Sequence, residues 1–185
     1  MISTADFRNG MSIEYEGNIY SIIEFQHHKP GKGGAVVRTK LKDLRSGATI
    51  NKTFRAGEKM EQAVIERKKK QFLYRADNAY YFMDLETYEQ IPLDVSVLGE
   101  SVKFLKEALE IQLLLWNDSI IGVELPTFID YKVTYTEPGL RGDTVSGTNK
   151  PATIETGAVV QVPLFIEIDD VIRIDTRTGQ YIQRV

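Results

Sequence analysis

Lys32 is the residue whose surroundings most clearly point to chemistry. It lies in the segment Lys29-Pro30-Gly31-Lys32-Gly33-Gly34, where glycine tolerates backbone angles that other residues resist and proline fixes its own φ. These residues predict a tight hairpin tip that holds one amine clear of the body of the protein. Lysine is a compact point charge on a flexible stem and a frequent target of covalent modification. An amine presented in this way suits insertion into a narrow anionic site.

The loop also has two simpler interpretations. A solvated turn residue is one of them, and the loop alone leaves it open. A nucleotide-binding P-loop is the other, and it requires glycine five residues before its Gly-Lys pair and Ser or Thr after it. Those positions hold Gln26 and Gly33, so the spacing excludes a P-loop.

Strand-like runs flank the loop at residues 19–25 and 35–41, and both are rich in β-branched and aromatic residues. Apolar and polar residues alternate again at residues 11–15 and 171–175. Short strands at regular spacing predict an all-β chain of small barrels. Residues 99–108 are the clearest helix candidate, residues 59–64 are expected to link the first barrel to the second, and the next boundary is expected at 126–127.

The charge is unevenly distributed along the chain, although its net value is only −3. Residues 1–63 hold 10 Lys and Arg against 7 Asp and Glu, whereas residues 64–126 hold 7 against 11 and residues 127–185 hold 6 against 8. Contacts with nucleic-acid phosphates are therefore expected in the N-terminal third. The candidates directly after the loop are Arg38, Lys40 and Lys42. A basic hairpin that is merely solvated surface remains the alternative.

Other chemical patterns are weak. His27 and His28 are adjacent, so their side chains point to opposite faces of a strand, and no further histidine or cysteine completes a metal site. We expect no metal, no cofactor and no enzymatic activity, because no nucleophile lies beside a base. The basic run 67–70 is interpreted as a solvated strand edge, and contact with nucleic-acid phosphate remains its alternative. No stretch is long and apolar enough to span a bilayer, so we expect a cytoplasmic protein with no membrane partner.

A dense block near the C-terminus carries a family resemblance. It comprises residues 132–144, with Thr-Glu-Pro-Gly-Leu-Arg-Gly-Asp-Thr at the end, then 150–158 and 162–166. Together with the lysine-tipped hairpin, these segments make the chain resemble bacterial elongation factor P from end to end. The resemblance implies an N-terminal SH3-like barrel at 1–63, a central OB-type barrel at 64–126 and a C-terminal OB-type barrel at 127–185. It also implies an elongated, bent outline similar to that of a transfer RNA.

The resemblance further implies a function. Members of this family bind the ribosome between the peptidyl and exit sites and relieve stalling when consecutive prolines are joined. Lys32 matches the tip residue that points toward the acceptor end of peptidyl-tRNA, and an enzyme extends it in many relatives. Gly142, Asp143 and Thr144 match a turn placed near messenger RNA in the exit site, while Tyr181 and Arg184 match a pair near the anticodon side of the transfer RNA. We therefore expect a monomer whose partners are the ribosome, peptidyl-tRNA, messenger RNA and a lysine-modifying enzyme.

Two alternatives from other classes remain. One is a paralogue of elongation factor P with a separate translational role. The other is an OB-type module that binds free single-stranded RNA. Stall relief on polyproline templates distinguishes elongation factor P from the paralogue. An RNA-binding module should bind RNA whether or not the peptidyl site of the ribosome is occupied, whereas elongation factor P should depend on that occupancy.

Overall fold

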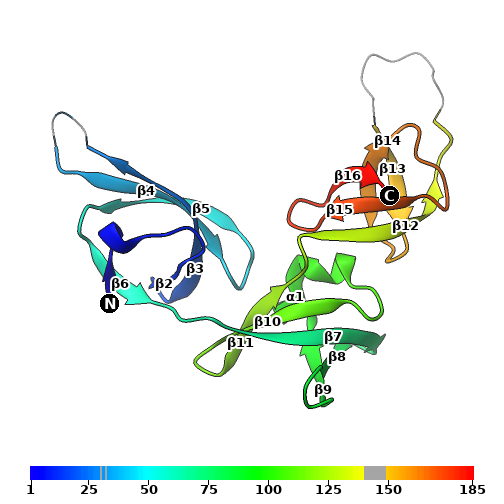
Figure 1. The fold of residues 1–185 in the computed structure, drawn as a ribbon, viewed down its shortest axis with the longest axis horizontal. Helices are drawn as coiled ribbons and strands as arrows, with labels where there is room; N and C mark the ends of the chain where they lie inside the picture. Colours follow the sequence, from blue (N-terminus) through cyan, green and yellow to red (C-terminus); the bar gives the residue numbers. More distant parts are fainter. Residues whose placement is uncertain (30, 32, 140–148) are drawn as a thin grey trace. The chain divides into compact units, whose positions relative to one another are not determined.

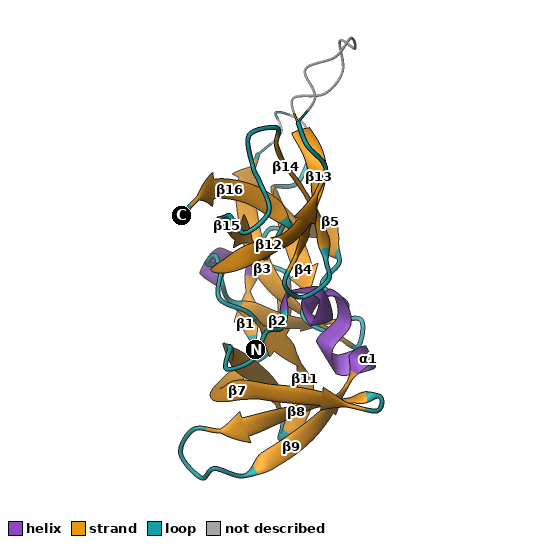
Figure 2. Ribbon diagram, turned by 90° about the vertical axis from the view of Figure 1, so that its right-hand side faces the viewer, coloured by secondary structure: helices purple, strands orange, loops and turns teal. Residues whose placement is uncertain are grey.

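Three β-sheets follow one another along the chain (Figure 1). The structure is a computed structural model that describes residues 1–29, 31, 33–139 and 149–185. Strands dominate it, and the few helical turns are short (Figure 2). The all-β fold expected from the sequence is therefore confirmed.

The first sheet has the strand order β1-β6-β2-β3-β4-β5. Its elements are β1 (Ile2–Ser3), the 3-10 helix η1 (Thr4–Asp6), β2 (Ser12–Tyr15), β3 (Asn18–His28), β4 (Val36–Asp43), β5 (Thr49–Arg55) and β6 (Lys59–Gln62). The sheet closes around a core that includes Phe7, Ile13, Ile22, Val37 and Phe54. This core lies directly beneath the two strands that support the lysine loop.

One expectation for this region is wrong, because residues 59–62 are not a linker. They form β6, which pairs with β1 through Ile2 and Met60 and with β2 through Ile13 and Gln62. Met60 is buried in the core. A single apolar residue among charged ones gave little sign of a strand, yet the barrel needs this segment to join its first two strands.

The second sheet has the order β11-β10-β7-β8-β9. Its elements are β7 (Glu66–Ala76), β8 (Ala79–Asp84), β9 (Gln90–Asp94), the helix α1 (Val95–Leu98), the 3-10 helix η2 (Gly99–Phe104), β10 (Glu110–Trp116) and β11 (Ser119–Glu124). The expected helix over 99–108 is only partly present, since η2 ends at Phe104. The carbonyl oxygen of Phe104 accepts from Tyr131 Oη at 2.6 Å, and Ala108 N donates to Phe72 O at 3.0 Å. Both groups that would extend the helix are thus bonded to other elements.

The interpretation of residues 67–70 as a strand edge is also wrong for Lys70. Strand β7 lies inside the sheet, between β10 and β8. Lys70 is buried and donates from Nζ to Asp84 Oδ2 at 2.5 Å. Lys70 and Phe72 are two residues apart and therefore face the same side of β7.

The third sheet has the order β14-β13-β12-β15-β16. Its strands are β12 (Phe128–Thr136), β13 (Asn149–Ile154), β14 (Val159–Pro163), β15 (Val171–Asp175) and β16 (Gln180–Arg184). Tyr131, Val133, Ile154, Ile172 and Ile174 are fully buried at its centre.

The chain forms two compact units. One comprises residues 1–68 and 113–122, and the other comprises 69–112 and 123–185. The tips of β10 and β11 therefore belong with the first sheet. They contribute Leu114 and Ile121 to a buried cluster with Ile19 and Ala63.

Candidate nucleic-acid interface

The lysine loop rises from a well-paired hairpin. Strands β3 and β4 pair up to His28 and Val36, and Ala56 N donates to Ala35 O at 2.9 Å just beyond the last pair. Gly33 has φ +116, a conformation that favours glycine over any residue with a side chain. The loop residues Lys29, Gly31 and Gly34 are exposed. Pro30 and Lys32 lie outside the described residues.

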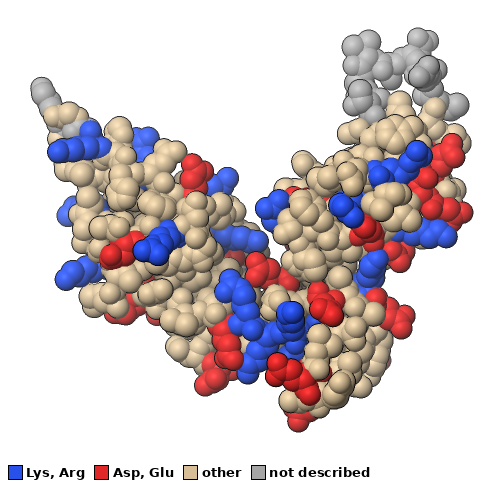
Figure 3. Space-filling view, viewed as in Figure 1, with Lys and Arg blue, Asp and Glu red and all other residues tan. Residues whose placement is uncertain are grey.

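A row of three basic side chains follows the loop on β4. Arg38, Lys40 and Lys42 are exposed and alternate with the buried Val37, Thr39 and Leu41. None of the three basic residues is ion-paired to another described residue. Figure 3 shows basic side chains along this part of the molecule.

The neighbours of this row complete a polar face. Across β5, the partners of Arg38, Lys40 and Lys42 are Thr53, Asn51 and Thr49, and cross-strand partners share one face of a sheet. On β3, Gln26 and Glu24 lie opposite Arg38 and Lys40. The register shifts at Ile23, and this bulge keeps Glu24 on the outer face although Ile22 is buried. Three cations flanked by hydroxyl and amide groups, with the Glu24 carboxylate beside Lys40, form a face of net positive charge that suits a phosphate backbone.

Tyr181 and Arg184 lie on the same face of β16. They pair with Ile174 and Ile172, and the register shifts between these pairs so that Ile182 is the extra residue of a bulge. Tyr181 is half-buried and packs against the core of the third sheet. The structure thus brings this predicted pair together on the core-facing side.

Arg184 is already engaged at the rim of that core. Its guanidinium lies 3.6 Å from Asp170 Oδ2 and 5.7 Å from the centre of the Phe165 ring. Half of the Arg184 side chain, 53%, remains exposed. Phe165 is 59% exposed, so this corner offers both a cation and an aromatic surface.

The predicted messenger-RNA contacts Gly142, Asp143 and Thr144 lie outside the described residues. The chain on either side is held firmly. Lys150 is buried and donates from Nζ to Glu137 O at 2.6 Å. A Cβ on Gly139 would lie 2.4 Å from the carbonyl oxygen of Leu164, so only glycine fits there. Both residues lie in the C-terminal block that carries the family resemblance, but neither was assigned a role from the sequence.

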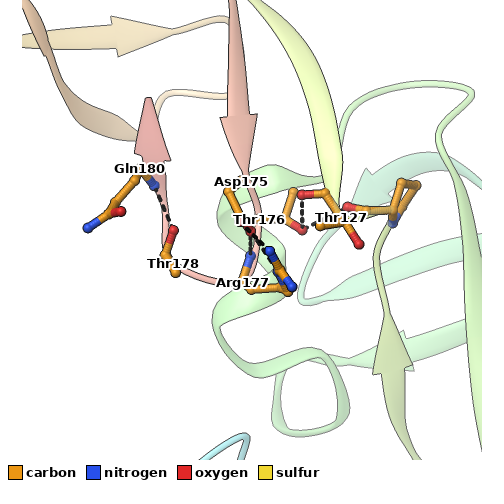
Figure 4. Close-up of polar contacts among 7 residues, drawn as sticks. Thr127, Asp175, Thr176, Arg177, Thr178 and Gln180 are labelled. Atoms are coloured by element: carbon orange, nitrogen blue, oxygen red, sulfur yellow. Dashed lines mark hydrogen bonds and ion pairs between the residues drawn. The ribbon is translucent and has the colours of Figure 1, made fainter. Parts of the chain in front are cut away.

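A hollow of about 730 Å³ lies within the second unit. It is lined by parts of η2 and by the turns around Thr156 and Thr178. Thr156 and Thr176 donate from their hydroxyls to Lys103 O and Pro126 O. Asp175 accepts three hydrogen bonds from Arg177, one from its backbone N and two from its guanidinium (Figure 4). These polar groups are committed to turn structure.

In the part of the chain that the structure describes, no three His, Cys, Asp or Glu side chains converge as a metal would require. His27 instead contacts Phe25 through its ring, with 5.7 Å between the two centres. No helix in the same described residues has both the length and the apolar character to cross a membrane.

Comparisons with known families cover nearly the whole chain. Residues 3–60 match the elongation factor P KOW-like domain, residues 65–123 match the elongation factor P OB domain, and residues 124–184 match the elongation factor P C-terminal domain. Elongation factor P of Pelotomaculum thermopropionicum is 57% identical over 185 residues, and that of Moorella thermoacetica is 55% identical over 184. Each match covers 100% of both chains.

A solved structure shares part of the fold. Eukaryotic translation initiation factor 5A from Methanococcus jannaschii superposes with a TM-score of 0.50 at 24% identity, over 66% of this chain and 92% of that one. This likeness supports the barrel architecture alone. The three sheets, the lysine hairpin and the matches above define a translation factor built from a KOW-like, SH3-type barrel and OB-type barrels.

The chain belongs to the elongation factor P family, and its role is that of a translation elongation factor.

Proposed function

We propose that this factor binds the ribosome between the peptidyl and exit sites and stimulates peptide bond formation at consecutive prolines. Lys32 points toward the acceptor end of peptidyl-tRNA. The observation that carries the proposal is the hairpin of β3 and β4, which pairs without interruption from Glu24 and Lys40 to His28 and Val36 at the loop. A paired hairpin is a stiff support for an amine that must reach a fixed target.

Positioning of the reacting groups matters most when proline is the residue being joined. Its ring fixes φ and its nitrogen is secondary, so the reacting groups align badly in the peptidyl transferase centre. A cation beside the acceptor strand restricts the motion of the ester, and holding reactants in a productive geometry lowers the entropic part of the barrier. The ribosome supplies the catalysis, and the factor uses no catalytic residue or cofactor of its own.

The remaining contacts follow the charge. Arg38, Lys40 and Lys42 contact phosphates of transfer or ribosomal RNA, since all three are exposed and free of carboxylate partners among the described residues. Arg184 contacts the anticodon side of the transfer RNA from the corner that it shares with Phe165, and Tyr181 supports this corner from the core. Residues 142–144 contact messenger RNA in the exit site.

A modifying enzyme extends Lys32 covalently and so increases the reach of the amine. Mass spectrometry of the intact protein from its native host measures this extension directly. The factor works as a monomer in the cytosol, where the ribosome and peptidyl-tRNA are its partners.

The proposal is tested with Lys32→Ala in reconstituted translation of a template that encodes consecutive prolines. We expect the variant to fold as the wild type does and to lose most stall relief, while a template without prolines is translated equally well by both. Full stall relief by Lys32→Ala contradicts the proposal. Binding to free single-stranded RNA with no dependence on an occupied peptidyl site would instead support an RNA-binding module.

A further inference from the structure

Strand β4 connects the lysine loop to a second contact at its opposite end. The loop precedes Val36, and Leu44 follows Asp43 directly after the strand. Eight residues of strand span about 26 Å at roughly 3.3 Å per residue. Leu44 and the lysine loop are therefore joined by one strand, which is paired on both sides by β3 and β5.

Leu44 rests against Gly122, which lies within strand β11 of the β10–β11 hairpin. A Cβ at position 122 would lie 2.7 Å from the carbonyl oxygen of Leu44. The backbone of Gly122 has no positive φ, so glycine is needed here for the close approach and not for an unusual conformation. Any other residue must push the two segments apart.

The turn at Leu44 is held in place by hydrogen bonds, so it cannot easily move away from Gly122. Asp43 Oδ1 accepts hydrogen bonds from Arg45 N and Ser46 N at 2.7 and 3.1 Å, and Asp43 N donates to Ala48 O at 2.8 Å. Leu44 N donates to Ile19 O at 2.9 Å. The carbonyl oxygen that meets Gly122 is thus fixed from both sides.

A buried apolar cluster surrounds the same contact. Ile19 and Ala63 from the first sheet pack with Leu114 and Ile121 from the hairpin, and Leu44 and Trp116 pack against this cluster. Ile19 is fully buried here, while its neighbour Tyr20 faces the core of the barrel. We call these residues, together with Gly122, the hairpin seat.

We propose that Gly122 is a positioning residue for Lys32. Because Gly122 has no side chain, the Leu44 carbonyl at the end of β4 can contact the hairpin seat. That contact sets the direction of β4, and so of the lysine loop, relative to the β10–β11 hairpin. This inference rests on the proposed role of Lys32. It assigns to a residue at the other end of β4 a part in aligning the reacting ester.

The test compares Gly122→Ala and Gly122→Val with the wild type on the polyproline template. We expect the maximal rate of stalled bond formation at saturating factor to fall by about tenfold or more for Gly122→Val, since misplacement by 1 Å can cost about 100-fold. Gly122→Ala should lose less. The factor concentration that gives half of the maximal effect should change little, and an unchanged maximal rate for Gly122→Val overturns the proposal.

A double variant separates positioning from a general structural defect. If Gly122 acts through Lys32, Lys32→Ala with Gly122→Val is no slower than Lys32→Ala alone, because the misdirected amine is already absent. Losses that multiply overturn the proposal. If Lys32→Ala alone keeps full stall relief, the proposed function fails, and that result is distinct from a failure at Gly122.

Hydrogen exchange supplies a readout independent of translation. The amide of Leu44 should exchange faster in the Gly122 variants, while amides of β2 and β3 in the barrel core keep their protection. If Gly122→Val fails to fold, Ile121→Val loosens the same seat by one methylene group and should lower the maximal rate in the same direction. Unchanged exchange at Leu44 together with an unchanged rate for Ile121→Val overturns the proposal.

Discussion

The Tyr131 hydroxyl donates a hydrogen bond of 2.6 Å to the carbonyl oxygen of Phe104, and both residues are buried. Tyr131 lies on β12, at the centre of the third sheet, whereas Phe104 ends the 3-10 helix of the preceding segment. Burial raises the pKa of the Tyr131 phenol above its ordinary value and so favours the protonated hydroxyl that donates this bond. One buried hydroxyl therefore ends the helix and joins it to the core of the C-terminal barrel.

Tyr131→Phe tests this bond directly. The variant keeps the ring and leaves a buried carbonyl without its donor, which costs about 1–3 kcal/mol of unfolding free energy. Urea denaturation measures the loss, and Tyr135→Phe, whose ring is 58% exposed, is the matched control. A Tyr131→Phe variant as stable as that control would show that the bond contributes nothing.

The pair of Lys70 and Asp84 predicts a dependence of stability on pH. The Lys70 ammonium lowers the pKa of Asp84, and hydrogen bonds from Thr87 N and Glu86 N lower it further. Because the pKa is lower in the folded state, the stabilisation is present above the unfolded pKa of about 3.9 and is lost as the pH falls toward the folded value.

Asp84→Asn should therefore be less stable than the wild type near neutral pH. The difference should stay constant down to about pH 5 and shrink at lower pH, as the wild-type carboxylate becomes protonated. Chemical denaturation at a series of pH values measures it, with Asp94→Asn as the control for an exposed capping carboxylate. A stability difference that does not change between pH 7 and pH 2 contradicts this assignment.

The basic face of β4 predicts a change in salt dependence. Replacing Arg38, Lys40 and Lys42 together by alanine removes three cations that have no carboxylate partner among the described residues. The slope of log binding constant against log salt should become shallower by about 0.7 to 0.9 for each phosphate that is no longer neutralised. Ribosome binding at several salt concentrations measures the slope. Lys59→Ala, an exposed lysine on β6, should leave it unchanged, and an unaltered slope for the triple variant removes these residues from the interface.

Arg184 should matter for function more than for stability. Its ion pair with Asp170 is long, at 3.6 Å, and lies at the surface on the Arg184 side, where 53% of the side chain is exposed against 23% for Asp170; surface pairs are typically worth about 0.2–1 kcal/mol. Arg184→Ala should therefore unfold within about 1 kcal/mol of the wild type while binding the ribosome–tRNA complex more weakly. Arg177→Ala is a suitable comparison, because Arg177 lies in the turn between β15 and β16 and forms a local pair with Asp175. Equal binding by Arg184→Ala and wild type would exclude the contact.

Some features were visible in the sequence because they depend on local pattern. The strands around the lysine loop alternate as β-branched and aromatic runs do, and β4 places Val37 and Leu41 inside while Arg38 and Lys40 face outward. The fold class followed from such runs together with the family resemblance. The basic face could be predicted for the same reason, since alternation alone decides which residues share a side.

Other features depend on partners that are distant in the sequence. Residues 59–62 form a strand because they pair with β1 and β2. The helix after Gly99 ends at Phe104 because the Phe104 carbonyl accepts a hydrogen bond from the Tyr131 hydroxyl. Lys70 could have been assigned to the interior from its spacing to Phe72. Gly122 carried a weak signal, because glycine inside a strand often marks a close backbone approach, but the sequence does not show that Leu44 is the neighbour.

The bulge at Ile182 gives the C-terminal corner an unusual tolerance of changes in chain length. In a regular strand, losing one residue turns everything beyond it to the opposite side. Here the strand holds one residue more than its partner, so losing Ile182 would flatten β16 and keep the Tyr181 ring and the Arg184 guanidinium on one side. A homologue that is shorter by one residue at this point would therefore present the same two side chains at this corner. A one-residue gap there in a sequence alignment would not indicate that the homologue has lost its contact with RNA.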